Sequence, residues 1–413
     1  MSMERITTCR VCQSKNLEPF FDLGKQPLAN SLPDHPGEKE EFYPLSLSFC
    51  RDCSLVQLDE TIPPEILFSH YLWITGTSAT ANRYADSFCD AVIASTDRPK
   101  DGYVLEVASN DGTFLIPFQK KGFTVLGIDP AENIAAMARQ QGIPTEAVFF
   151  GTAAAKDIVT KHGKAKIVFA RNVLPHVAGT RDFVAGLRDC LSDDGTLAVE
   201  VHYAKVILDD LHYDSIYHEH LCYFTLKSLE RLFNDFGLHI FNITQSPISG
   251  GSIVAYAKKR AGEVSPSVAE YRAEEARSRT NDLESWKGFA ARSFAHREKL
   301  LALLREQKGR GGKIAGWGAS ARSSTLLNFC GITTDILPAI IDLNPLKQGK
   351  YTAGTHIPIE KAEDVMDAHP DCIFLLAWNF QDEIISILGS KFKFKGVCIL
   401  PFPKEPHSVE LGG

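Results

Sequence analysis

Short apolar runs separated by helix-like stretches recur through much of this 413-residue sequence, and they restrict the fold more than any other feature. Between about residues 69 and 258, the main runs predict buried parallel strands at residues 103–108, 124–129, 167–170 and 196–201. Parallel strands need crossover helices, so the region predicts a doubly wound α/β sheet. Two later runs on either side of residues 249–251 predict a hairpin and an antiparallel edge.

A second alternation begins near residue 313 and predicts another, smaller Rossmann-like sheet. Before it, helix-forming residues dominate the sequence, so we expect one or two long connecting helices. A single hydrophobic core rarely serves more than about 300 residues, so several domains are expected. The expected domains are residues 1–68, 69–260, 261–308 and 309–413.

Two Cys-x-x-Cys pairs mark the first domain, formed by Cys9, Cys12, Cys50 and Cys53. Four thiolates paired at turn spacing suit a tetrahedral zinc ion, and a site filled by four protein ligands is structural. The 37 residues between the pairs are more than usual, which keeps a redox pair or a coincidence open. The sequence thus predicts a small N-terminal zinc-binding domain.

The formal net charge of -7 argues against a surface that neutralises nucleic-acid phosphates. No secretory signal is recognisable, and no apolar run reaches the ~18 residues of a membrane span. We therefore expect a cytoplasmic protein with no nucleic-acid or membrane partner, in which disulfides are not expected. Its oligomeric state is expected to be monomer or homodimer.

A loop after the first predicted strand of the large sheet carries polar groups that suit a ligand, including Glu106, Ala108, Asn110 and Gly112. Asp129 ends the next strand, about 20 residues later, where an acidic side chain can bind a ribose diol. The loop is poor in glycine, which favours S-adenosylmethionine over a dinucleotide. A plain turn followed by a helix cap is the alternative.

Asn172 and His176 follow the third predicted strand, at the ligand-binding end of such a sheet. Asn172 could face the methyl donor and His176 the acceptor. For His176, a structural role is as plausible as a functional one.

Tyr217, His218, Glu219 and His220 bring proton-transfer groups together within four residues. Histidine titrates near neutral pH, and a neighbouring carboxylate or phenol can orient it, which favours a general base. A metal site at His218 and His220, or a structural network around Glu219, are the alternatives.

Gly316, Gly318, Ser320 and Arg322 lie where the second sheet begins, in a G-x-G-x-x-A pattern between a strand and a helix. Such a loop can hold a nicotinamide cofactor or the diphosphate of a nucleotide substrate, and Arg322 could add charge for a phosphate. A loop that has lost phosphate binding is the third possibility.

The order of these motifs is more specific than any one of them. Taken with Gly250-Gly251-Ser252 and the run at residues 347–354, it resembles the S-adenosylmethionine-dependent C-methyltransferases that act on nucleotide-linked 4-keto-hexoses to make branched deoxysugars. The resemblance covers nearly the whole chain. It implies a zinc-binding domain, a methyltransferase domain and a Rossmann-like C-terminal domain that binds the nucleotide, joined by a helical connector.

The resemblance also implies residue roles. His220 would remove a proton beside the ketone with help from Tyr217 and Glu219, and His176 and Tyr71 or Trp73 would line the pocket. The Gly316 loop and Ser252 would contact the substrate, expected to be a dTDP-sugar. Trp73 and Ser249 depart from the family pattern, where tyrosine and histidine are common, so the acceptor sugar could differ.

The sequence thus predicts a C-methyltransferase that acts through an enolate. A sugar O-methyltransferase or an NAD-dependent sugar-nucleotide oxidoreductase are the nearest alternatives. A zinc-ribbon RNA methyltransferase and a non-catalytic nucleotide-sugar scaffold are further ones.

Overall fold

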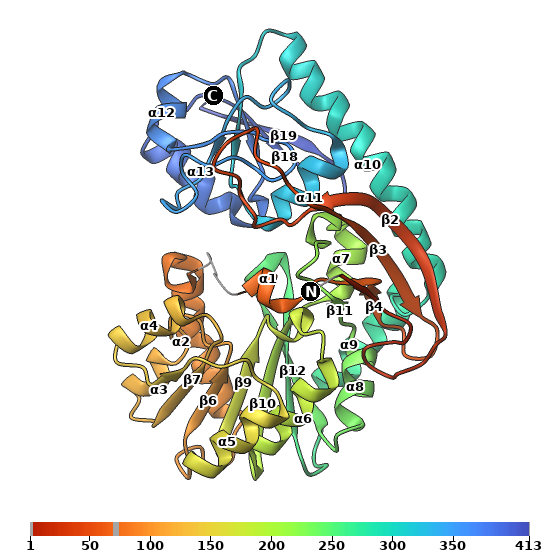
Figure 1. The fold of residues 1–413 in the computed structure, drawn as a ribbon, viewed down its shortest axis with the longest axis vertical. Coiled ribbons are helices and arrows are strands. Elements are labelled where there is room, and N and C mark those ends of the chain that lie inside the picture. The colour runs from red at the N-terminus through yellow and green to blue at the C-terminus, as the bar shows by residue number, and fades with distance from the viewer. Residues whose placement is uncertain (1–2, 69–73, 413) are drawn as a thin grey trace. The chain divides into compact units, whose positions relative to one another are not determined.

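The computed structural model describes residues 3–68 and 74–412 (Figure 1). The chain forms two compact units, each built from three stretches of sequence. The first contains Met1–Glu18, Ser48–Lys205 and Leu221–Leu283, and the second contains Pro19–Leu47, Val206–His220 and Glu284–Gly413. The segment between the two cysteine pairs and the segment that ends at His220 therefore both belong to the second unit. The four predicted domain ranges divide the sequence differently from these two units and remain predictions.

A seven-stranded sheet forms the centre of the first unit, in the order β12-β13-β10-β9-β6-β7-β8. All strands run parallel except β13, which pairs antiparallel with β10 and β12. The strands are β6 (Val104–Val107), β7 (Val125–Ile128), β8 (Thr145–Glu146), β9 (Ala165–Arg171), β10 (Leu191–His202), β12 (His239–Ser246) and β13 (Ser252–Lys258). The predicted doubly wound sheet and its antiparallel edge are confirmed.

Helices cover both faces of this sheet, as shown by the burial of every residue of β6 and β7. The helices of this unit are α1 (Pro64–Phe68), α2 (Ala79–Ala94), α3 (Ile116–Lys120), α4 (Glu132–Gln140), α5 (Thr152–His162), α6 (Thr180–Cys190), α8 (Leu226–Asn234) and α9 (Pro266–Ser278). Ser78 caps α2, and Thr225 and Ser228 form a capping box on α8, so polar side chains satisfy the first amides of both helices. Phe88 and Phe118 each pack on Phe169 of β9, which fixes α2 and α3 on the sheet.

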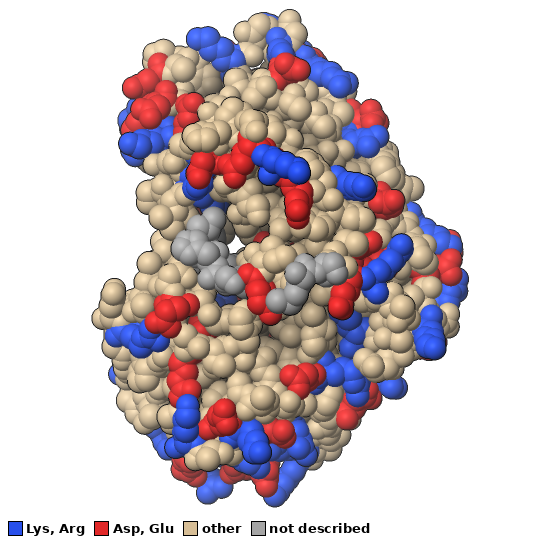
Figure 2. All heavy atoms as spheres, in the orientation of Figure 1, with Lys and Arg blue, Asp and Glu red and all other residues tan. Residues whose placement is uncertain are grey.

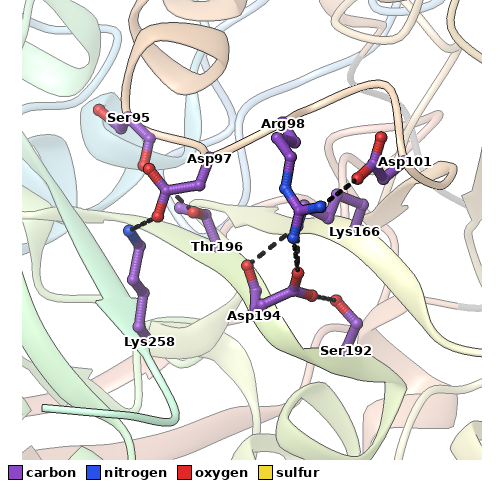
Figure 3. A network of polar contacts seen from close by, with 9 residues as sticks. All are labelled: Ser95, Asp97, Arg98, Asp101, Lys166, Ser192, Asp194, Thr196 and Lys258. Atoms are coloured by element: carbon purple, nitrogen blue, oxygen red, sulfur yellow. Dashed lines mark hydrogen bonds and ion pairs between the residues drawn. The ribbon is translucent and has the colours of Figure 1, made fainter.

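Charged side chains cluster at the amino ends of the parallel strands (Figure 3). Lys166, near the start of β9, lies 2.8 Å from Asp194, which also pairs with Arg98. Lys258 pairs with Asp97 at 2.9 Å. The carboxylate of each pair is exposed to water, so each pair contributes at most about 1 kcal/mol. This end of the sheet is therefore structural, whereas ligands bind beyond the opposite, carboxyl ends.

A six-stranded sheet forms the centre of the second unit, in the order β16-β15-β14-β17-β18-β19. It is parallel except for β19. Its strands are β14 (Ile314–Trp317), β15 (Ile340–Ile341), β16 (Ile359–Glu360), β17 (Cys372–Leu375), β18 (Gly396–Leu400) and β19 (His407–Leu411), and its helices are α10 (Leu283–Gly309), α11 (Ala321–Cys330), α12 (Ala362–Asp367) and α13 (Gln381–Ser390). The predicted second Rossmann-like sheet is confirmed, and α10 is the long helix expected before it.

Short strands surround the cysteine pairs. They are β1 (Glu4–Arg5), β4 (Val56–Leu58), β5 (Glu60–Thr61) and β11 (Cys222–Tyr223), together with the longer β2 (Leu17–Pro27) and β3 (Phe42–Cys50). β1 pairs with β5, and the others form a sheet in the order β11-β4-β3-β2. α7 (Ala204–Asp210) and the 3-10 turns η1 (Thr75–Thr77), η2 (Leu174–His176), η3 (Tyr213–Ser215), η4 (Ile248–Gly250) and η5 (Trp378–Phe380) complete the fold.

Acidic and basic side chains are interspersed on the face that Figure 2 shows, so no continuous basic stripe runs across it. Within the described residues, no helix is both long enough and apolar enough to cross a membrane.

Candidate active site and zinc centre

The four cysteines of the two pairs meet in the first unit. Their sulfur atoms all lie within 4.8 Å of one another, and the Cys9–Cys53 and Cys12–Cys50 sulfurs are 3.5 Å apart. A tetrahedral zinc ion with Zn–S bonds of about 2.3 Å needs sulfur separations of nearly 4 Å, so the geometry fits. Zinc would complete a closed four-thiolate site and hold the two pairs together.

Matching turns bring the cysteines together. The amide of Gln13 donates to the carbonyl of Cys9 at 3.0 Å, and the amide of Ser54 donates to the carbonyl of Cys50 at 2.8 Å. Gln13 and Ser54 both have positive φ, 63° and 64°, so each pair is followed by the same tight reversal. The 37 intervening residues do not disturb this centre, because they leave it through β2 and return through β3.

The loop after β6 folds into a compact polar turn. Ala108, Asn110 and Gly112 all have positive φ, between 50° and 82°. The carboxylate of Asp129, which follows β7, accepts hydrogen bonds from the amides of Asn110 at 2.9 Å and Ala131 at 3.0 Å. The structure thus brings together the predicted loop and the predicted acidic residue at the carboxyl ends of neighbouring strands.

Glu106 is buried beneath this loop, and among the described residues its Oε2 atom has no hydrogen-bond partner. Burial raises the pKa of this carboxyl well above its usual value. A buried acceptor of this kind suits a ligand that brings its own donor, and the ammonium group of S-adenosylmethionine is such a donor. Glu106, Asn110 and Asp129 therefore fit the methyl donor, which supplies an electrophilic methyl group when bound.

Asn172 directly follows β9 and has a φ of 50°. Its amide donates to the carbonyl of Glu200, and its side chain contacts the carboxylate of the same residue at 3.4 Å. That carboxylate also binds Arg171 at 2.7 Å and Ser246 at 2.6 Å. The role of Glu200 could not be predicted from the sequence, since an acidic residue inside an apolar strand gives no sign of which groups it pairs with.

His176 is the last residue of η2. The amide of Leu221 donates to the carbonyl of Pro175 at 2.7 Å. This hydrogen bond fixes the turn that carries His176 to the chain immediately after His220.

His220 has a defined hydrogen-bond geometry within the second unit. Its Nδ1 atom lies 2.8 Å from the carbonyl oxygen of Ser215, and its Nε2 atom lies 2.7 Å from the phenol oxygen of Tyr217. A carbonyl can only accept, so Nδ1 carries a proton, and when the ring is neutral its Nε2 lone pair faces the phenol. His220 is therefore held in the tautomer that a base acting through Nε2 requires.

Glu219 is buried, and its Oε1 atom accepts a hydrogen bond of 2.6 Å from the side-chain amide of Asn30. Burial raises the pKa of Glu219 to about 7, while the Asn30 amide acts in the opposite direction. His218 is buried beside it, with Nε2 3.1 Å from the carbonyl oxygen of Pro44. Burial lowers the pKa of His218. Among the described residues, the grouping suited to a metal is the four cysteines, which leaves the metal interpretation of this segment without support.

Gly316 and Gly318 lie where close packing requires glycine. A side-chain carbon at Gly316 would lie 2.8 Å from Ile340, and one at Gly318, whose φ is 102°, would lie 2.3 Å from Ala377. Ser320 caps α11 by accepting from the amide of Ser323.

Arg322 lies on α11 and points to the segment before His220. It donates to Asp214 at 3.0 Å and to the hydroxyl of Ser215 at 2.6 Å, and its guanidinium lies 4.7 Å from the centre of the Trp378 ring. The indole of Trp378 also donates to Asp214 at 2.7 Å. The role of Asp214 could not be predicted from the sequence, in which it resembles an ordinary turn residue. The phosphate role of Arg322 remains a prediction.

Ser252 is buried at the start of β13, where its hydroxyl donates to the carbonyl of Ile248. Tyr71 and Trp73 lie outside the described residues. The residues predicted to bind the methyl donor, together with His176, thus lie in the first unit. The second unit contains Tyr217, Glu219, His220, the Gly316 loop and Arg322.

A Rossmann-like sheet with a polar donor loop, together with a four-cysteine zinc centre, defines an S-adenosylmethionine-dependent methyltransferase that carries a structural zinc. Family models agree with this class along the chain. Residues 9–68 match a zinc binding domain, residues 81–242 a methyltransferase domain, and residues 247–403 a C-methyltransferase C-terminal domain.

C-methyltransferase NovU of Streptomyces niveus is 33% identical to this chain over 408 residues, which cover 98% of this chain and 97% of NovU. The chain therefore belongs to the C-methyltransferase family. Solved structures match more weakly. Magnesium protoporphyrin IX methyltransferase of Synechocystis, with bound S-adenosylmethionine, is 15% identical and covers 43% of this chain and 78% of its own, with a TM-score of 0.33. The CcbJ methyltransferase of Streptomyces caelestis is 16% identical and covers 44% and 90%, with a TM-score of 0.35.

Proposed function

We propose that this C-methyltransferase transfers a methyl group to a carbon beside the 4-ketone of a nucleotide-linked deoxysugar, which we expect to be a dTDP-sugar. The observation that carries the proposal is the geometry of His220, whose Nδ1–H is fixed by Ser215 and whose Nε2 lone pair faces a phenol. A methyl transfer to carbon needs a base that removes a C–H proton, and a ketone makes the neighbouring C–H acidic enough for a neutral imidazole.

In the proposed reaction, Nε2 of His220 takes the proton and the C–H electron pair becomes the enolate. The enolate carbon then forms a bond to the methyl group of the donor as the methyl–sulfur bond breaks. The electron pair of the broken bond stays on sulfur. The products are the C-methylated keto sugar, S-adenosylhomocysteine and a protonated His220, which returns its proton to solvent.

Tyr217 has two successive partners in this scheme. Its phenol oxygen lies 2.7 Å from Nε2 of His220, where it would donate to the neutral ring. When the sugar binds, the phenol would turn to the ketone oxygen, so it exchanges one acceptor for another and frees the base. A donor directed at the oxygen that gains charge stabilises the enolate more than the ketone.

Residues outside this pair would position the two substrates. Glu106, Ala108, Asn110, Gly112, Asp129 and Asn172 would bind the methyl donor. His176, Ser252, Tyr71 and Trp73 would line the sugar pocket, and the Gly316 loop with Ser320 and Arg322 would bind the nucleotide. Positioning is a large part of the task, because a transfer between two bound substrates depends on their alignment.

The direct test is a panel of nucleotide-linked 4-keto sugars incubated with enzyme and S-adenosylmethionine. Mass spectrometry should detect the replacement of one hydrogen by a methyl group, and NMR should place the new methyl on a carbon next to the ketone. A methyl group on oxygen would support an O-methyltransferase instead. Turnover that requires NADH would support an oxidoreductase.

A further inference from the structure

The zinc centre does not explain the length of the segment between the two cysteine pairs. The cysteines need only their turns, yet 37 residues separate Cys12 from Cys50. Most of these residues, Pro19–Leu47, belong to the second unit, which also contains His220. We therefore expect the connection between β2 and β3 to serve a function within the second unit.

Two points of this connection are fixed to the loop before β16. The carboxylate of Glu40 accepts hydrogen bonds of 3.0 Å from the amide of Gly354 and also contacts Nε2 of His356. The amide of Tyr351 donates to the carbonyl of Pro33 at 2.9 Å. These contacts also give a structural role to the run at residues 347–354, which the zinc centre and the donor loop leave unexplained.

This connection and the first residues of β3 together contact both residues that precede His220. The side chain of Asn30 donates to Glu219 at 2.6 Å. The carbonyl of Pro44 accepts from His218, and the ring of Tyr43 packs edge-on against the His218 ring, with 6.0 Å between ring centres. Residues 28–44 are called the strap below.

We propose that the strap positions the catalytic segment and that Asn30 is a positioning residue, which holds the Glu219 carboxylate in place and in its charged form. This inference rests on the proposed function, because Glu219 is taken to assist His220. A negative charge on the residue that precedes His220 in the sequence favours the imidazolium that forms when the base takes the sugar proton.

The physical basis is the burial of Glu219. A buried carboxylate is costly unless donors satisfy it, and an amide N–H that donates to it favours the ionised form. Burial raises the pKa of Glu219 to about 7 even with the Asn30 hydrogen bond in place. The titratable neighbours in its own segment are engaged elsewhere, His218 with Pro44 and His220 with Ser215 and Tyr217. Loss of the Asn30 donor should therefore leave Glu219 protonated at neutral pH.

The test compares Asn30→Asp with the wild type. Aspartate keeps the shape of asparagine but replaces the donor with a second carboxyl group, so the two acids must share a proton. We expect the acidic limb of the kcat pH profile to move up by one unit or more, with about a tenfold loss at pH 7 that recovers at higher pH. Asn30→Ala, which only removes the donor, should move the limb in the same direction. Asn234→Asp makes the same chemical change on the exposed end of α8 and should leave the profile unchanged.

A second readout does not depend on turnover. Carbon-13 NMR of protein labelled at the glutamate carboxyl, with Glu219→Gln to assign the signal, follows the ionisation of Glu219 directly. The inference predicts a higher midpoint in Asn30→Asp and Asn30→Ala than in the wild type, and unchanged midpoints in either variant would overturn it. If the two variants show the raised midpoints but the wild type methylates no keto sugar, the proposed function fails while the role of Asn30 stands.

Discussion

The phenol oxygen of Tyr217 lies 2.7 Å from Nε2 of His220, which follows it by three residues in the sequence. The other ring nitrogen is held 2.8 Å from the carbonyl of Ser215, whose hydroxyl in turn binds Arg322. The imidazole ring is therefore fixed in orientation, with Nδ1 protonated, and the segment that holds it is supported from α11. This arrangement suits a base that must accept a proton from carbon.

Tyr217→Phe should keep the ring and remove only the phenol group. Loss of a donor to a developing oxyanion typically costs about 100-fold to 1,000-fold in kcat. The affinity for S-adenosylmethionine should not change. Steady-state kinetics and calorimetry of donor binding measure the two effects. Tyr103→Phe, which loses a phenol bonded to the carbonyl of Gly163 at 3.1 Å, is the matched control. Equal kcat values for both variants would exclude an oxyanion role for Tyr217.

Asp129→Asn should weaken binding of the methyl donor. The change keeps the size of the side chain but removes the charge, and hydrogen bonds to charged groups contribute about 2 kcal/mol, or about 30-fold in Kd. Calorimetry with S-adenosylmethionine tests this value. Asp157→Asn on the exposed side of α5 is the control. A wild-type Kd for Asp129→Asn would show that the donor does not contact this carboxylate.

Zinc should bind at one ion per chain. Cys50→Ser removes one of four thiolates and should lower the metal content and expose the N-terminal strands to protease, because the metal holds both turns together. Cys190→Ala, which alters a buried cysteine of α6, should retain its zinc. Elemental analysis and limited proteolysis provide the measurements. Full zinc content in Cys50→Ser would contradict the assignment.

Glu219→Gln should stabilise the protein at alkaline pH while it lowers kcat. Burial raises the pKa of Glu219 to about 7, compared with about 4.3 for an unfolded glutamate. The stability contributed by the protonated form is complete below pH 4.3 and is lost as the pH rises through 7. Well above pH 7 the wild type should therefore be less stable than the variant by about 4 kcal/mol. Urea unfolding at pH 5.5 and pH 8 tests this, and an equal difference at both values would contradict it.

Elements fixed by local patterns could be predicted from the sequence. The apolar runs at residues 103–108 and 124–129 became β6 and β7, because buried strands need continuous apolar residues. The cysteine spacing predicted the metal centre for a similar reason, since two short turns fix most of its geometry. β2 and β3 were not predicted, because proline and charged residues in that region interrupt an apolar pattern.

Contacts between distant residues could not be predicted in this way. Asn30 and Glu219 are 189 positions apart, and nothing near Asn30 marks it as the partner of a buried acid. Arg322 lies beside a glycine loop, where a phosphate was the natural expectation, yet the structure pairs it with Asp214 and Ser215. Such pairings depend on how the chain packs, which local residue patterns do not contain.

The most direct test of the account is hydrogen exchange at the sugar carbon. The enzyme is incubated in D2O with a nucleotide-linked 4-keto sugar and no methyl donor, and NMR follows deuterium uptake beside the ketone. We predict uptake with the wild type and with His239→Asn, and a rate about 100-fold to 10,000-fold lower with His220→Asn. Uptake at the wild-type rate in His220→Asn would show that another group removes the proton.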